Sequence, residues 1–200
     1  MKSEGWATFL QVSKKSIIKQ YTKFELTIEL TPKGLKNYNK VIEVVFTLLQ
    51  NMKKKGPQDK YFKEFNEAGH LKFAYQDRGK VVDQCSKIAG KLGKLNDEDI
   101  PLIIKHSCMR EKFDKEGVRE LTDMFLDINR ILIFVASKSF EKESSMQYEQ
   151  WMLTKYKVEP IEGDLLNAIV KPNVDLKGKV IDIPPENKYF PKKFDIVAAD

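Results

Sequence analysis

The stretch YTKFELTIELTP, residues 21–32, joins a strand pattern directly to a helix start. Apolar residues alternate with charged or hydroxyl residues along its first ten positions, which is typical of a half-buried strand in an antiparallel sheet. We expect one face of this strand to be buried, carrying Phe24, Leu26, Ile28 and Leu30. The decisive stretch therefore predicts a sheet whose polar face is open to solvent.

The end of the same stretch predicts the helix that follows the strand. Thr31 can cap a helix through its hydroxyl, and Pro32 suits the first helical position. Apolar residues then recur at helical spacing up to Gly56, which is expected to end the helix. These residues are Leu35, Tyr38, Val41, Ile42, Val45, Leu48, Leu49 and Met52.

Further outward, the pattern predicts more helices than strands. We expect helices from Pro57 onward, over Val81–Leu92, from Asn96 or Asp97 to Lys112, after Asp114, and over 163–170. In the helix after Asp114, the residues expected to face inward are Val118, Leu121, Met124 and Phe125.

Two later segments are β-prone and predict strands, namely Arg130–Ala136 and Trp151–Val158. The fold class is therefore α+β, with helices packed on one face of an antiparallel sheet. Residues 1–170 are expected to form the domain, and the proline-rich residues 171–200 an extended tail of it.

Charge and composition favour an ordinary globular surface. The 200 residues carry a net charge of +6, with 35 Lys and Arg against 29 Asp and Glu, and the basic residues are mostly lysines scattered among acids. A nucleic-acid-binding domain ranks far behind other classes, because base readout and phosphate clamping favour arginine. No apolar run is long enough to span a membrane.

The cysteines suggest a reducing compartment. Cys85 and Cys108 lie far apart and form no CxxC pair, and the N-terminus lacks the apolar stretch of a signal peptide. We expect two reduced thiols and an intracellular location, either cytoplasmic or mitochondrial.

The chain lacks the residue patterns of an independent catalyst. Neither His70 nor His106 has a second histidine at the spacing that zinc hydrolases use, as in H-x-x-E-H. No serine elbow and no phosphate-binding loop is present. We therefore expect no catalytic residue, no metal ligand and no cofactor in this chain.

Several segments, taken in order, resemble the second domain of the insulin-degrading-enzyme (insulysin or pitrilysin-type) metallopeptidase family. The resemblance runs over the whole chain. Its motifs are Gly5-Trp6, Glu29–Leu35, Gly56-Pro57-Gln58, Phe73-x-Tyr75-x-Asp77, Ser86–Gly90, Val135–Phe140, Trp151-x-x-Thr154-x-Tyr156 and Pro185–Ile196.

The resemblance implies a specific arrangement. Such enzymes are built from four related α+β domains, with zinc held on an inverted H-x-x-E-H helix of the first. The second domain has no metal ligands, packs beside the catalytic domain and walls the chamber that holds the peptide substrate. A catalytic insulinase-type domain and a peptide are thus the implied partners, and zinc belongs to the parent enzyme. The alternative is a pseudo-peptidase, a structural or interaction subunit of a larger complex.

Two family sites carry over by position. The family anchors its substrate along an edge strand through a Leu-Val-Gly-Gly segment, which here is Leu10-Gln11-Val12-Ser13. The family also binds polyanions through arginines in a segment that here begins at Lys80, with Lys87 following in the helix. Lys80, Lys87, Lys91 and Lys94 share one helical face, and a solvated face is the favoured alternative to an anion site.

The resemblance also implies that the family's domain begins before the residue matched by Met1. On this interpretation the fold is truncated at its N-terminus, and a strand edge needs a partner from elsewhere.

Overall fold

The computed structural model describes residues 1–18, 21–77, 79–93, 95–143, 145–172, 174, 178 and 180–191. It divides into two compact units, each formed by segments from distant parts of the sequence. Unit 1 comprises Met1–Phe9, Glu29–Lys54 and Arg119–Asp182, and unit 2 comprises Leu10–Ile28, Lys55–Val118 and Ile183–Asp200.

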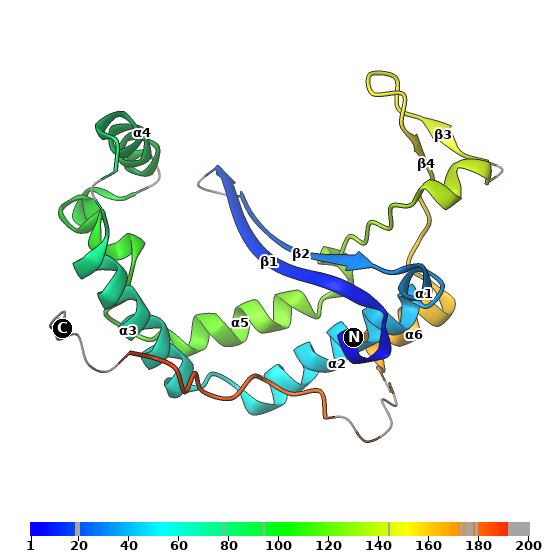
Figure 1. Cartoon of the computed structure of the whole chain (residues 1–200), viewed down its shortest axis with the longest axis horizontal. Helices are drawn as coiled ribbons and strands as arrows, with labels where there is room; N and C mark the ends of the chain where they lie inside the picture. Colours follow the sequence, from blue (N-terminus) through cyan, green and yellow to red (C-terminus); the bar gives the residue numbers. More distant parts are fainter. Residues whose placement is uncertain are drawn as a thin grey trace, which may run out of the picture. The chain divides into compact units, whose positions relative to one another are not determined.

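Helices make up most of the regular structure, as Figure 1 shows. The α-helices are α1 (Pro32–Leu35), α2 (Tyr38–Lys55), α3 (Asp59–Tyr75), α4 (Val81–Leu92), α5 (Lys115–Phe125) and α6 (Gly163–Val170). The 3-10 helices are η1 (Lys2–Glu4), η2 (Asp97–Leu102), η3 (Lys105–Ser107), η4 (Ile128–Arg130) and η5 (Lys138–Lys142). The strands are β1 (Ala7–Ile18), β2 (Tyr21–Leu30), β3 (Gln147–Tyr148) and β4 (Lys155–Tyr156).

Strand β2 forms where the alternating stretch predicts it, and it pairs with β1 running in the opposite direction (Figure 1). The chain is therefore of the α+β class with antiparallel strands, as expected. The predicted burial of one face is wrong for part of the strand, because Phe24 is 43% exposed and Leu26 42%. Alternation decides which residues share a face, but burial requires a covering layer, and the described chain covers this face only in part.

The start of α1 is held against the N-terminal segment in unit 1. The Thr31 hydroxyl accepts a hydrogen bond from Gly34 N at 3.0 Å and donates one to Gly5 O at 2.6 Å. Thr31 N donates to Trp6 O at 3.0 Å, and the Trp6 side chain is buried. The predicted cap at Thr31 is therefore confirmed, and it also fixes the start of the chain.

The predicted single helix from Pro32 to Gly56 is interrupted after α1. Asn37 N donates to Gly34 O at 2.9 Å, while the side-chain amide of Asn37 donates to Lys33 O at 2.8 Å. Lys33 O is the carbonyl that a continuous α-helix would pair with Asn37 N. The asparagine side chain thus replaces one helical bond and separates α1 from α2. Gly56, at φ 65°, ends α2 as predicted.

The core of unit 1 is formed largely by α2 and α6. The buried side chains include Val41, Val44 and Phe46 of α2 and Ala168 and Ile169 of α6. Side-chain amides of α2 extend this packing, since Gln50 donates to Val170 O and Asn51 to Ile181 O. The predicted helix at 163–170 is therefore confirmed as α6, a main element of this core.

In unit 2, α3 packs against the segment that follows η3. Asn66 donates to Arg110 O at 2.7 Å and accepts from Arg110 N at 2.9 Å, so one side chain satisfies both backbone groups. Phe62 stacks on Phe113 with ring centroids 4.7 Å apart. Gly69 is buried where the carbonyl of Cys108 approaches α3 closely.

Residues near the C-terminus lie along α3 within the same unit. Tyr61 Oη donates to Pro184 O at 2.7 Å, and Asn187 N donates to a carboxylate oxygen of Glu64 at 3.4 Å. The described residues between 171 and 191 contain neither helix nor strand. A domain boundary at 170 stays a prediction, and residues 192–200 of the predicted tail lie outside the described part.

The predicted strand at Arg130–Ala136 is wrong. Arg130 ends η4, and residues 131–137 have no strand pairing, with Leu132 75% and Phe134 84% exposed. A central strand needs neighbours to satisfy its backbone groups, and the described residues provide none here.

The other predicted strand, Trp151–Val158, is shorter in the structure: only β4 forms, and it pairs with β3 through Gln147–Tyr156 and Tyr148–Lys155.

The helix predicted up to Lys112 is replaced by η2 and η3, with Pro101 inside η2. Asp114 does cap α5, accepting from Gly117 N at 2.9 Å. The predicted inward face of α5 is wrong, because three of its residues are at least 38% exposed. They are Val118, Leu121 and Met124.

Candidate functional site

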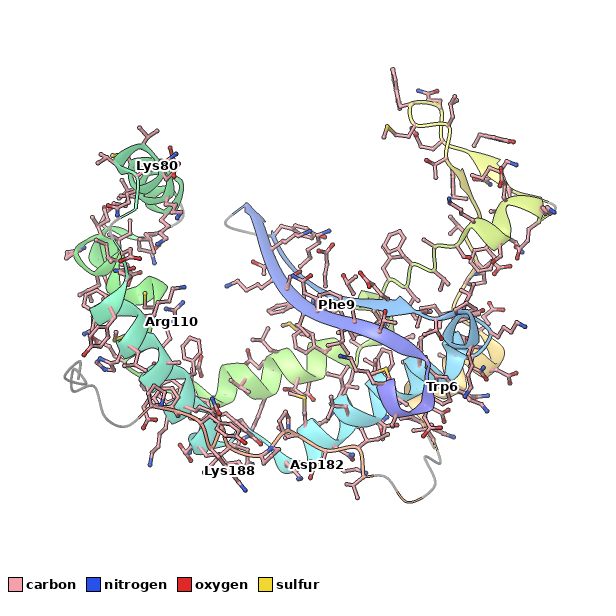
Figure 2. The ribbon with its side chains drawn as sticks, viewed as in Figure 1. Trp6, Phe9, Lys80, Arg110, Asp182 and Lys188 are labelled. Carbon is pink, nitrogen blue, oxygen red and sulfur yellow. The ribbon has the colours of Figure 1, made fainter. Side chains whose placement is uncertain are left out.

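The candidate binding segment lies on β1. Its four residues, Leu10–Ser13, are consecutive in the strand (Figure 2 labels the adjoining Phe9). Leu10 is 46% and Val12 68% exposed, Gln11 is exposed, and Ser13 is half-buried. In the part of the chain that the structure describes, the sheet contains only β1 and β2, so β1 has a strand neighbour on one side. Such an edge presents backbone donors and acceptors to an extended peptide.

The side chains at Val12 and Ser13 are compatible with pairing at this edge. Successive Cβ atoms of a strand point to the two faces of the sheet, while hydrogen bonds to a neighbouring strand lie in its plane. A valine and a serine in place of glycines therefore shape the faces beside an added peptide without occupying the edge itself.

An ion-pair cluster ties the two strands together. The carboxylate of Glu25 on β2 lies 2.8 Å from Lys15 Nζ on β1 and 2.6 Å from Lys23 Nζ. The hydrogen bonds from Lys15 and then Lys23 lower the pKa of Glu25 to about 2. The cluster thus contributes to strand pairing whenever Glu25 is ionised.

Acidification is expected to loosen this hairpin. The pKa of Glu25 in the fold, about 2, lies below its ordinary value of 4.5, so the carboxylate's contribution is complete above pH 4.5 and is lost as the pH falls through about 2. Amide protection factors across β1 and β2, each taken relative to the intrinsic exchange rate at the same pH, should therefore fall over that window. The matched Glu25→Gln variant should show the faster exchange already at neutral pH and no further change that depends on this residue. Equal exchange in the two proteins at pH 7 would contradict the role assigned to Glu25.

The second predicted group of residues lies on α4. Lys80 is the residue before its first turn, Lys87 lies within it, and both are exposed. Their spacing places them on one side of the helix, together with Lys91. Lys94 lies outside the described residues. The ammonium groups can bind phosphate as point charges, and their polyanion role stays a prediction.

The residues present do not fit a zinc centre. His70 is exposed on α3, and His106 Nδ1 lies 3.6 Å from Asp99 Oδ1. Cys85 is exposed and Cys108 buried, and neither forms a disulfide. Among the described residues, no three His, Cys, Asp or Glu side chains gather closely enough to hold a metal ion. No step of a reaction is therefore assigned to a metal bound by this chain.

The sequence did not indicate the ordered hairpin tip after β3. Glu149 accepts from Trp151 N at 3.0 Å and from Met152 N at 2.5 Å, and these hydrogen bonds lower its pKa. Leu153 follows at φ 53°, and the side chains from Trp151 to Leu153 are more than 70% exposed. The apolar run at 151–153 favours a strand, and the position of Glu149 before it is the one sequence feature that indicates a turn.

A shallow polar pocket lies in unit 1 but does not define a ligand. Its volume is about 260 Å³. Its lining combines lysines, acids and amides, and consists of Asn39, Lys40, Glu43, Asp164, Asn167, Ala168 and Lys171. Because the lining carries both positive and negative side chains, it does not indicate the charge of a ligand. The β1 edge is therefore the better-defined candidate binding site.

Comparison with known proteins gives consistent matches. Residues 73–200 match the family described as the middle or third domain of peptidase M16. The chain is 30% identical to insulin-degrading enzyme of Mus musculus over 205 residues, and 24% identical to insulin-degrading enzyme-like 1, peroxisomal, of Arabidopsis thaliana over 200. Each alignment covers 100% of this chain, but 19% of the first relative and 20% of the second.

The fold also matches a solved structure. A crystal structure of pitrilysin superimposes with a TM-score of 0.77 and 19% identity, covering 98% of this chain and 20% of that one. The chain thus spans about a fifth of the length of the proteins it matches. In the described ranges, no helix combines the length and apolar character needed to cross a membrane.

Proposed function

The chain belongs to the peptidase M16 family as a middle domain, and on that premise we propose that it is the non-catalytic domain of an insulysin-like zinc metalloendopeptidase. In this role it walls the chamber that receives the peptide and holds part of that peptide by strand addition along β1. The parent enzyme is proposed to work inside the cell.

One observation carries the peptide-binding part of the proposal. Leu10–Ser13 lie in a strand with a strand neighbour on only one side in the described sheet, and Leu10 and Val12 expose much of their surface. Backbone hydrogen bonds at such an edge supply affinity that depends little on the peptide's sequence, while exposed apolar side chains beside it add apolar contact. An edge of this kind suits a peptidase domain that must hold extended peptides of varied sequence.

The proposal assigns cleavage to another domain. Among the described residues, the donor set does not fit zinc, whereas an inverted zinc motif needs two histidine ligands on one helical turn with a glutamate base between them. The implied partner is therefore a catalytic insulinase-type domain that supplies the zinc, and the implied substrate is a peptide.

Strand addition can be tested with insulin B chain as the probe peptide. Backbone N–H groups of an extended peptide point alternately to its two edges, so N-methylation of every second residue blocks only one edge. Two peptides are compared, one N-methylated at odd positions and one at even positions; we call these the two methylation phases. We expect one phase to weaken binding to the 200-residue chain and the other to leave it unchanged. Loss of three hydrogen bonds at about 1 kcal/mol each would weaken binding by about a hundredfold.

The two methylated peptides are each other's control, because they have the same composition and the same number of methyl groups. Fluorescence anisotropy of the labelled peptides gives the dissociation constants. Equal losses in both phases, or no loss in either, would show that the peptide does not add as a strand.

The purified chain is expected to bind no zinc and to cleave no peptide by itself. Metal analysis after equilibration with zinc should find far less than one equivalent, and insulin B chain should remain intact on incubation. The matched comparison is the same assay with a chelator, which should change nothing. Chelator-sensitive cleavage together with near-stoichiometric zinc would overturn the non-catalytic assignment.

A further inference from the structure

Helix α4 carries an exposed apolar stripe along its whole length. Val81, Cys85, Ile88 and Leu92 are four, three and four residues apart, the alternation that places side chains along one seam of a helix–helix pair. Val81 is 74% and Leu92 44% exposed, Cys85 is exposed, and Ile88 is half-buried. Val82, next to the stripe, is also 74% exposed.

One border of the stripe is basic. Lys80, Lys87 and Lys91 follow the same side of α4, and Asp83 is the acid nearest to them within the helix (Figure 2 labels Lys80). The opposite border carries Val82 and Ala89, which bear no charge. The helix thus combines an apolar seam with a positive charge on one side only.

We infer that α4 docks an amphipathic helix of a partner, whose apolar stripe is bordered by aspartate and glutamate. The seam of α4 is about 18 Å long at 1.5 Å per residue, which accommodates about three turns of a second helix. Acidic side chains on the partner would face Lys80, Lys87 and Lys91 across the seam and would set its orientation. This surface is distinct from the β1 edge and does not depend on peptide binding there.

Two other occupants fit the surface less well. An antiparallel pair of α4 helices from two copies would bring the lysine borders together, and like charges at that position repel. A lipid surface favours amphipathic helices with tryptophan, phenylalanine or leucine at the interface, and the stripe of α4 contains a single such residue, Leu92. Charge and side-chain chemistry therefore favour the acidic helix.

Cys85 provides a direct readout, because it lies within the stripe and is exposed. Two designed helical peptides of about three heptads serve as probes, both with leucine at the seam positions, one bordered by glutamate and the other by lysine. Iodoacetamide alkylation of the full chain is followed by mass spectrometry at each cysteine, and the buried Cys108 serves as the internal reference. At a concentration ten times the dissociation constant, the glutamate peptide is expected to slow alkylation of Cys85 by about tenfold.

Variants separate the apolar seam from its charged border. Replacing Lys80, Lys87 and Lys91 together by glutamate should transfer protection from the glutamate peptide to the lysine peptide. Val81→Ser with Leu92→Ser should abolish protection by either peptide while the chain still melts cooperatively, since Val81 is 74% and Leu92 44% exposed. Val158→Ser is the matched control, because Val158 is 79% exposed outside α4, and it should leave protection intact.

The inference is overturned if both peptides protect Cys85 equally or if neither does. It is also overturned if the chain alone sediments as a dimer whose Cys85 is slow to react, and becomes monomeric with Val81→Ser and Leu92→Ser, because the occupant is then a second copy. Protection by phosphatidylserine-containing vesicles in the absence of protection by the glutamate peptide would identify a lipid surface instead.

Discussion

A Gly34→Ala variant is expected to lose the packing between α1 and the start of the chain. A Cβ at this position would lie 1.9 Å from Trp6 O and 2.8 Å from the Trp6 carbonyl carbon, far inside van der Waals contact. The obstructing atoms belong to the backbone, so no rotamer change can relieve the clash. Thr31 N also donates to Trp6 O, so moving that carbonyl breaks a hydrogen bond. A destabilisation of about 3 kcal/mol is expected.

Urea unfolding followed by tryptophan fluorescence measures this change, because Trp6 is buried at the contact. Gly90→Ala is the matched control, since Gly90 is helical and no atom outside its own helix lies within 4 Å of the added Cβ. That control should be stabilised by about 0.5–1 kcal/mol, the usual gain for alanine over glycine in a helix. If Gly34→Ala unfolded at the same urea concentration as the unmodified chain, the close approach at Trp6 would be wrong.

A Gly69→Ala variant is expected to open the corresponding contact in unit 2. Here the added Cβ would lie 2.3 Å from Cys108 O and 3.1 Å from the Met109 side chain. The segment that must move also carries Arg110, whose backbone is held by both atoms of the Asn66 amide. Displacing it therefore costs hydrogen bonds as well as packing, and we expect a loss of about 3 kcal/mol.

Cysteine reactivity reports this second change. Cys108 is buried in the unmodified chain, so its alkylation should be slow, and Gly69→Ala should accelerate it strongly. Cys85, which is already exposed, is the internal control and should react at the same rate in both proteins. Slow alkylation of Cys108 in a cooperatively folded Gly69→Ala protein would contradict the contact.

Sequence patterns predicted the features that depend only on residues close together in the chain. The Thr31 cap follows from a side-chain hydrogen bond and the end of α2 from the positive φ of Gly56, and both are confirmed. The predicted bounds of α4 are confirmed as well. The split between α1 and α2 was not predicted, because it depends on whether Asn37 turns its amide back to the Lys33 carbonyl. Sequence patterning does not distinguish an asparagine that faces solvent from one that replaces a helical bond.

The predictions that were wrong concern features that depend on contacts between residues far apart in the sequence. The run Arg130–Ala136 has the composition of a central strand, but a strand exists only where neighbours satisfy its backbone groups. The faces expected at Leu26 and Leu121 have the right spacing, yet both side chains are more than 40% exposed, because spacing does not supply a covering layer. The close contacts of Gly34 and Gly69 join segments far apart in sequence, and no local pattern indicates them.

The candidate site also combines features that the sequence predicted with features that only the structure gives. The family resemblance indicated Leu10–Ser13, and the structure contributes the strand, its single neighbour and the exposure of Leu10 and Val12. The spacing of Lys80 and Lys87 predicts one helical face; Lys87 lies within α4, and Lys80 is the residue immediately before its first turn. The exposed seam beside them depends on what the rest of the chain leaves uncovered, which spacing alone does not determine.

Amide hydrogen exchange of β1 with and without saturating insulin B chain tests the central claim most directly. If the peptide adds to the edge of β1, amides within Leu10–Ser13 that point to that edge should exchange about tenfold more slowly in the complex, while amides of α4 should not change. The N-methylated peptide of the blocking phase should leave the exchange of Leu10–Ser13 as it is in the free chain. Bound peptide that leaves every amide of Leu10–Ser13 unprotected would contradict the peptide-holding role proposed for this domain.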